Sequence, residues 1–117
     1  MTTTDNDERG DPELTVQPTK QRYIAADHPR FQLGQILSTP GALKVMADND
    51  VDPLSLVQRH VRGDWGVVCS SDGRANEDAV QYGDRVLSSY LMKSGAVVWV
   101  LTEFDRSTTT FLLPSDY

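Results

Sequence analysis

The chain has 117 residues but only one cysteine and two histidines. A single cysteine, Cys69, cannot form an intrachain disulfide, which fits the reducing cytoplasm. Because Cys69 follows Val67 and Val68, we expect it to be a small buried thiol. His28 and His60 lie too far apart in the sequence to form a zinc-ligand spacing, so we expect neither a metal nor a cofactor.

Long apolar runs are also missing. No stretch approaches the ~20 apolar residues of a membrane-spanning helix. The N-terminal residues lack the apolar core of a signal peptide. The sequence therefore predicts a cytoplasmic protein that does not associate with membranes.

Basic residues are outnumbered, 11 against 17 acidic ones, and the formal net charge is −6. An acidic surface opposes non-specific binding to DNA, RNA and anionic membranes. Aromatic and basic residues are too sparse for a nucleic-acid platform, so nucleic acid is expected only in a local pocket. The charge also permits an alternative, in which the chain imitates the charge of DNA.

The sequence divides into a polar N-terminal part and a part that can fold. Residues 1–27 are polar, with prolines at positions 12 and 18, and predict a disordered N-terminal tail because little apolar area can be buried. Residues 28–117 predict a single α+β domain. Thr39-Pro40 predicts the start of a helix that runs to about Asp48, and Asp52-Pro53 predicts a second helix from Pro53 to about Arg62. A cap at Ser71 or Asp72 predicts a third helix through Tyr82.

The remaining apolar segments read as strands. A short strand is expected within Phe31–Leu37, and Trp65–Cys69 is a further strand or an extended link. Alternating segments with turns between them predict a C-terminal antiparallel meander: Arg85–Met92, Ala96–Glu103 and Thr108–Leu113. The fold class is thus α+β, with N-terminal helices packed on a meander of three to four strands. Leu43 and Leu54 are expected to face the core, and Trp65 to be buried between the second helix and the sheet.

Polar side chains concentrate on the meander and just before it. His60 can act as a general acid or base, and Glu103 and Arg106 are further catalytic candidates. Alternatively, His60 is a favourable cation at a helix C-terminus, and the threonines reflect strand propensity. Candidate binding residues are Arg85, Ser89, Tyr90, Thr102, Asp105, Arg106, Thr108 and Thr110. The chain has no phosphate-binding glycine-rich loop and no nucleophile elbow, so no reaction class is indicated.

The stretch from Leu33 to Tyr117 resembles a family of small bacterial proteins encoded on plasmids, integrative elements and prophage-like regions. Members often carry the label of subunit M of a type I restriction endonuclease, which this chain cannot be, since it lacks an S-adenosylmethionine motif. The resemblance implies a cytoplasmic accessory protein of a mobile element and carries over no catalytic residues. The matching pieces are Leu33-Gly34-Gln35, Thr39-Pro40-Gly41-Ala42-Leu43, Arg59-His60, Gly63-Asp64-Trp65-Gly66, Asn76, Arg85, Leu87-Ser88-Ser89-Tyr90, Thr102-Glu103, Asp105-Arg106, Thr109-Thr110, Leu112-Leu113-Pro114 and Tyr117.

The expected architecture is also similar to that of barnase-like and colicin-type ribonuclease toxins. Those enzymes need an acid–base pair and a cation for the phosphate, which His60 or Glu103 with Arg85 or Arg106 can supply. Our leading prediction is a non-enzymatic protein that binds a protein partner, in host defence or element maintenance. A small metal-independent ribonuclease-like or nucleotide-binding enzyme is the alternative, and a homodimer is also allowed.

Overall fold

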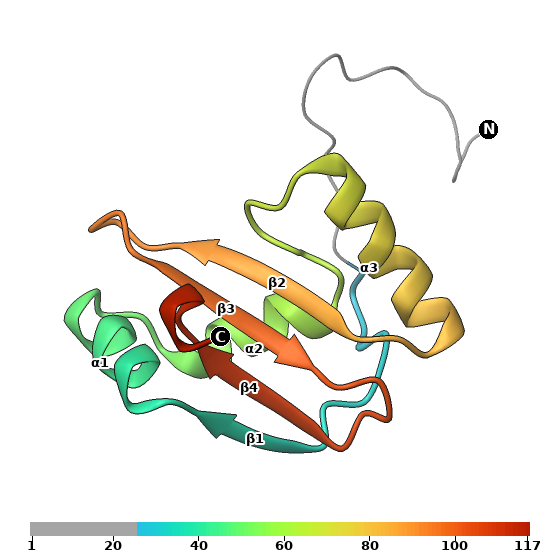
Figure 1. Cartoon of the computed structure of the whole chain (residues 1–117), viewed down its shortest axis with the longest axis horizontal. Coiled ribbons are helices and arrows are strands. Elements are labelled where there is room, and N and C mark those ends of the chain that lie inside the picture. The colour runs from blue at the N-terminus through green and yellow to red at the C-terminus, as the bar shows by residue number, and fades with distance from the viewer. Residues whose placement is uncertain (1–25) are drawn as a thin grey trace.

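The computed structural model describes residues 26–117 (Figure 1). Almost all of the tail predicted for residues 1–27 lies outside the described residues. Three helices precede the meander, which confirms the α+β class. The elements are β1 (Gln35–Ser38), α1 (Pro40–Asp48), α2 (Pro53–Val61), α3 (Ser70–Tyr82), β2 (Val86–Leu91), β3 (Val97–Thr102), β4 (Thr108–Leu112) and the 3-10 turn η1 (Pro114–Asp116).

The four strands form one mixed sheet in the order β1-β4-β3-β2. The meander of β2, β3 and β4 is antiparallel, as predicted, but β1 pairs with β4 in parallel. The early strand also starts later than expected. Gly34 has a φ of 64° and lies so close to Ser107 that a Cβ would overlap its carbonyl oxygen. The chain therefore turns at Gly34, so that Phe31 and Leu33 pack into the interior before β1 begins.

The first two helices begin at their predicted signals. The Thr39 hydroxyl accepts a hydrogen bond from the Ala42 N–H at 3.2 Å, and the Asp52 carboxylate accepts one from the Leu54 N–H at 3.0 Å. Each satisfies an N–H that the helix itself leaves free. The third helix differs, because it starts at Ser70 and has no side-chain cap. Cys69, expected to be buried, is exposed just before this helix.

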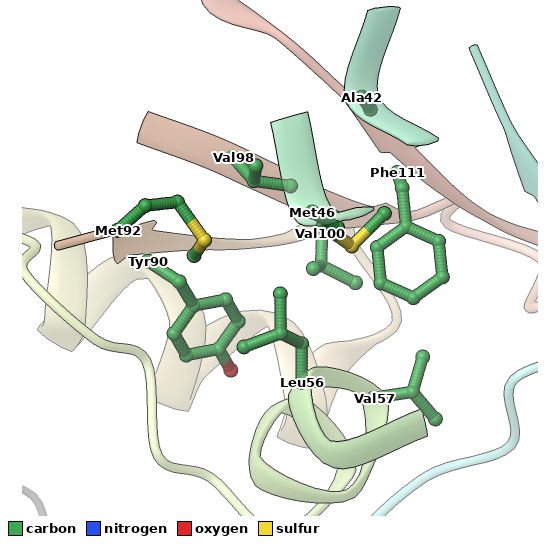
Figure 2. Close-up of a cluster of buried hydrophobic side chains, with 9 residues drawn as sticks. All are labelled: Ala42, Met46, Leu56, Val57, Tyr90, Met92, Val98, Val100 and Phe111. Atoms are coloured by element: carbon green, nitrogen blue, oxygen red, sulfur yellow. The ribbon is translucent and has the colours of Figure 1, made fainter. Parts of the chain in front are cut away.

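Helices α1 and α2 cover one face of the sheet, here called the inner face. Its strand residues are Val86, Ser88 and Tyr90 of β2, Val98, Val100 and Thr102 of β3, and Thr109 and Phe111 of β4. Figure 2 shows Met46, Leu56 and Val57 of the two helices packed against Tyr90 and Val100 of the sheet. The expectation for Leu43 and Leu54 is wrong, since both side chains are exposed. Met46 faces the core, as the helix pattern predicts, and Ala42 and His60 turn inward as well.

The opposite face of the sheet is here called the outer face. It consists of Leu37 of β1, Thr108, Thr110 and Leu112 of β4, Val97, Trp99 and Leu101 of β3, and Leu87, Ser89 and Leu91 of β2. Within residues 26–117, only the C-terminal segment crosses this face, where the rings of Tyr117 and Trp99 meet at 5.8 Å (Figure 1). In the same residues, no helix is both long and apolar enough to cross a membrane.

Candidate functional site

His60 is the centre of a buried polar chain on the inner face. It is 0% exposed and comes from the last turn of α2. Its Nδ1 lies 2.6 Å from the Ser88 hydroxyl, and its Nε2 lies 2.9 Å from the Thr102 hydroxyl. Thr102 in turn lies 2.7 Å from the Thr109 hydroxyl, which donates to the Leu33 carbonyl at 2.7 Å. The chain of hydrogen bonds thus ties α2 to β2, β3, β4 and the segment before β1.

The number of available protons fixes which group donates in each of these hydrogen bonds. A hydroxyl has one proton to donate. Because Thr109 donates to the Leu33 carbonyl, Thr102 must donate to Thr109 and accept from Nε2–H of His60. Nδ1 of the neutral ring then accepts from Ser88. We assign the Nε2–H tautomer on this basis.

The surroundings of His60 keep its ring neutral. The Phe31 ring meets it edge-on at 5.2 Å, and the Trp65 ring lies at 6.2 Å. Burial away from water, assisted by the positive charge of Arg106, lowers the pKa of His60 to about 3. The charged form is disfavoured because the interior solvates it poorly. A neutral and enclosed imidazole serves the packing of the domain, so its geometry gives the predicted acid–base role no support.

Arg106 and Asp105 organise the turn between β3 and β4. The Arg106 guanidinium donates to the backbone carbonyls of Asp84, Ala79 and Glu103, and it lies over the Phe31 ring at 5.5 Å. The Ala79 carbonyl belongs to the last turn of α3 and also accepts from the N–H groups of Gly83 and Asp84. The Asp105 carboxylate accepts from the Ser107 N–H at 3.0 Å, and hydrogen bonding to the Ser107 side chain and N–H lowers the pKa of this carboxyl. Both residues thus fasten the turn.

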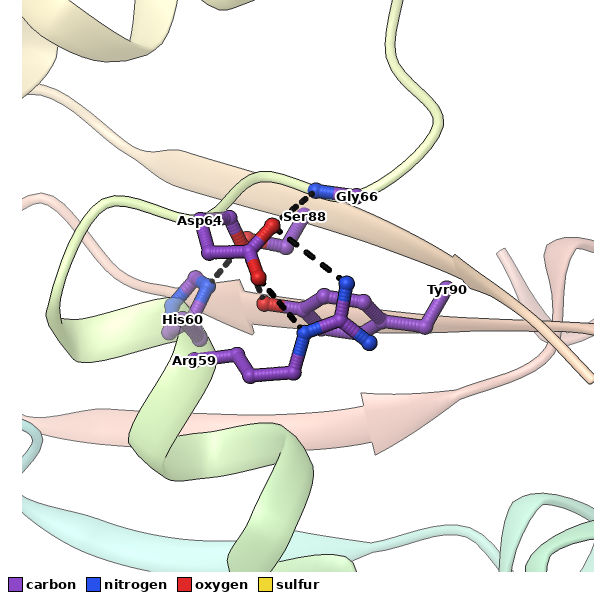
Figure 3. Close-up of polar contacts among 6 residues, drawn as sticks. All are labelled: Arg59, His60, Asp64, Gly66, Ser88 and Tyr90. Carbon is purple, nitrogen blue, oxygen red and sulfur yellow. Dashed lines mark hydrogen bonds and ion pairs between the residues drawn. The ribbon is translucent and has the colours of Figure 1, made fainter. Parts of the chain in front are cut away.

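Tyr90 belongs to a second polar cluster, which holds the loop after α2 (Figure 3). Its hydroxyl donates to the Asp64 carbonyl at 2.6 Å, and the Arg59 guanidinium lies over its ring at 4.6 Å. Arg59 also pairs with the Asp64 carboxylate at 2.7 Å. Burial raises the pKa of the Tyr90 hydroxyl far above its ordinary value. Tyr90 is therefore part of the interior and does not reach the outer face.

The Trp65 side chain follows the same loop into the interior. It is 1% exposed, which confirms the prediction of burial, and it packs with Ala79 of α3 and Val86 of β2. Its indole N–H donates to Glu77 at 3.1 Å, and the Glu77 carboxylate also binds the Arg30 guanidinium at 2.8 and 3.0 Å. Trp65 therefore anchors α3 and the segment around Arg30 to the sheet.

The outer face gathers the other predicted residues. Arg85 donates to the Tyr117 hydroxyl at 2.6 Å and lies 3.8 Å from the Glu103 carboxylate. Both charged groups are partly exposed, so water weakens their attraction. Strand alternation puts Ser89, Thr108 and Thr110 on the same face. Trp99 and Tyr117 were missed as site residues. Strand alternation in β3 puts Trp99 on the same face as Glu103, so the sequence contains a signal for it. No local sequence signal indicates that Tyr117 lies on this face.

The sheet therefore separates the candidate residues. His60, Tyr90 and Thr102 lie at the inner face, whereas Arg85 and Glu103 lie at the outer face. The remaining outer-face candidates are Ser89, Thr108 and Thr110. Among residues 26–117, no group of three or more His, Cys, Asp or Glu side chains is arranged to hold a metal ion.

Comparison with known proteins gives no match. No protein-family model, no curated protein and no solved structure is significantly similar to this chain. The family resemblance read from the sequence motifs therefore stays a prediction.

Proposed function

We propose that the chain is a non-enzymatic binding protein that recognises a protein partner through the outer face. The observation that carries this proposal is the unequal covering of the sheet: α1 and α2 pack on the inner face, and neither reaches the outer one. Trp99 and Tyr117 lie together on the outer face, with Arg85 beside them. Tryptophan, tyrosine and arginine are the residue types that contribute most to protein–protein binding.

The proposed partner has a chemistry that complements this face. The apolar centre around Trp99 matches an apolar patch on the partner, and the hydroxyls of Ser89, Thr108 and Thr110 supply a polar rim. The net charge of −6 favours a partner surface with basic groups. Opposite charges raise the rate of encounter and disfavour acidic competitors.

The proposed biological role is that of a cytoplasmic accessory protein of a bacterial mobile element. The partner then belongs to the defence machinery of the host or to the maintenance machinery of the element. The support for this role is the motif resemblance of Leu33 to Tyr117, and the outer face supports only the binding of a protein.

The ribonuclease-like alternative has less support. Its acid–base pair and its phosphate cation must converge on one ligand. Here the His60 ring is enclosed on the inner face, and Glu103 lies on the outer one. The Arg106 donors are bound to backbone carbonyls. Charge mimicry of DNA stays an alternative that no observed geometry favours.

Site-specific photo-crosslinking in the bacterial host tests the proposal. A photoreactive amino acid at Thr110 reports on the outer face, and one at Gln58, exposed on α2, is the matched control. We expect a discrete adduct with a single protein from position 110 and none from position 58. The adduct should disappear in Trp99→Ala but persist in Leu54→Ala, which alters an exposed side chain of α2. Equal adducts from both positions, or an adduct indifferent to Trp99→Ala, would contradict the outer-face proposal.

A further inference from the structure

The two edges of the sheet are treated differently by the fold. At the β2 edge, the Asn76 side chain donates to the Leu87 carbonyl at 2.8 Å and accepts from the Leu87 N–H at 3.0 Å. Two residues further along, the Ser89 N–H donates to the Trp65 carbonyl at 3.0 Å, and the Ser89 carbonyl accepts from the Val67 N–H at 2.7 Å. These four hydrogen bonds occupy the outward main-chain groups of Leu87 and Ser89, two of the residues that a further strand would pair with.

At the other edge, β1 pairs only with β4 in the part of the chain that the structure describes. The Gln35 N–H donates to the Ser107 carbonyl and the Thr39 N–H donates to the Phe111 carbonyl, both at 2.9 Å. Successive residues of a strand direct their N–H and C=O groups to opposite sides. The main-chain groups of Ile36 and Ser38 therefore point away from β4. In the described part of the chain, β1 is the last strand on this side (Figure 1).

Within residues 26–117, the β1 edge has few of the features with which proteins prevent strand pairing. Such features are very short edge strands, charged side chains, proline, bulges and a covering element. With four residues, β1 is short, and this is the one feature of the set that it has in the described part of the chain. The strand reads Gln-Ile-Leu-Ser and carries neither charge nor proline. Ile36 is 43% exposed and Leu37 is 41% exposed. An uncharged, half-exposed strand with free main-chain groups is a template for another strand.

We propose that this edge pairs with the β1 edge of a second copy of the chain, around a two-fold axis through Leu37. The strands run antiparallel, with Ile36 of one copy opposite Ser38 of the other. Both residues direct N–H and C=O outward, so this register forms four hydrogen bonds between the copies. Leu37 meets its own counterpart on the outer face. The outer faces of the two copies then form one continuous surface on an eight-stranded sheet.

The symmetry of the register favours a second copy, since Ile36 and Ser38 pair reciprocally across the two-fold axis. The net charge of −6 makes two copies repel, but the paired strand itself is uncharged, so no charge is buried. A pairing of four-residue strands buries less than the ~800 Å² per partner of a standard interface. We therefore expect a weak, reversible dimer that strengthens when salt screens the repulsion. This pairing goes beyond the proposed function and does not require an external partner.

The first experiment measures the mass of the full chain by sedimentation velocity over rising protein concentration, at low and high salt. We expect a shift from monomer to dimer that occurs at lower concentration in high salt. Leu37→Lys places two like charges opposite each other and should weaken the dimer roughly tenfold or more. Leu91→Lys is the matched control, since Leu91 is 59% exposed on the same face but lies on β2. Circular dichroism of each variant verifies that it is folded.

A second experiment tests the register by disulfide formation in a Cys69→Ser background. Directly opposed residues without mutual hydrogen bonds lie about 4.5 Å apart at Cα, within the range of a disulfide. Leu37→Cys should therefore cross-link two copies on mild oxidation. Ile36→Cys should not, because Ile36 faces Ser38 of the second copy.

The outcomes separate this inference from the proposed function. A chain that stays monomeric at every concentration overturns the pairing, as does a dimer weakened equally by Leu37→Lys and Leu91→Lys. Equal cross-linking by Leu37→Cys and Ile36→Cys overturns the register. None of these results depends on the photo-crosslinked adduct, which reports the binding of an external protein at Trp99.

Discussion

The buried His60 ring should make the stability of the domain depend on pH. In the unfolded chain its pKa has the ordinary value of 6.5, whereas in the folded domain it is about 3. Below pH 6.5 the unfolded state therefore binds a proton that the folded state rejects. The stabilisation is fully present above pH 6.5 and is lost as the pH falls towards 3.

The magnitude follows from the difference between the two pKa values. Each pH unit between them changes the free energy of unfolding by about 1.4 kcal/mol. Between pH 7 and about pH 4.5, His60 alone should therefore remove about 3 kcal/mol. Such a loss is a large share of the 5–15 kcal/mol typical of small domains. Most carboxylates titrate below this window, so the imidazole should dominate it.

Urea unfolding at a series of pH values measures this loss. His60→Gln is the informative variant, because an amide supplies one donor for Thr102 and one acceptor for Ser88 but has no proton to gain. We expect His60→Gln to be less stable than wild type at neutral pH but nearly insensitive to pH down to about 4.5. His28→Gln, which removes the exposed histidine, should keep the wild-type dependence. Parallel losses in wild type and His60→Gln would refute the reasoning.

Three further substitutions have defined consequences for the free energy of unfolding. Trp65→Ala should cost roughly 3–5 kcal/mol in denaturant unfolding, because it empties a fully buried site; a midpoint near wild type would mean that the indole is exposed. Gly66→Ala should cost at least ~1–3 kcal/mol in thermal unfolding, because φ is 76° and a Cβ would overlap the Ser89 carbonyl. Thr102→Val leaves the Nε2–H of His60 without an acceptor and should lower the free energy of unfolding in urea by about 1–3 kcal/mol. Thr110→Val, on the outer face, should change this free energy little. Equal effects of the two variants would contradict the buried series of hydrogen bonds through His60.

The helices and the meander could be predicted because their signals are local. Thr39-Pro40 and Asp52-Pro53 each combine a cap with a proline, and both helices begin there. The parallel pairing of β1 with β4 could not, since it joins segments some 70 residues apart and depends on the close approach of Gly34 to Ser107. Nothing near Gly34 in the sequence signals that approach.

The candidate site was predictable in composition but not in arrangement. Strand alternation separates Thr102 from Glu103, but whether His60 meets the first or the second depends on how α2 crosses the sheet. The pairing of the Arg106 guanidinium with the Ala79 carbonyl is likewise a contact between distant segments. Cys69 follows two valines and looked buried, yet the chain leaves β2 after a single bridge at Gly66, and the thiol lies in solvent beside Ser71.

The Asn76 side chain has a consequence for the number of copies that can assemble. Pairing through one edge closes on itself after two copies, because the shared edge is then used up. A sheet with two free edges can add copies without end and grow into a filament. The Asn76 amide binds Leu87 as the main chain of a neighbouring strand would: it donates to the Leu87 carbonyl and accepts from the Leu87 N–H. Together with the main-chain groups of Trp65 and Val67, which bind Ser89, this side chain on α3 limits self-assembly to a finite number of copies.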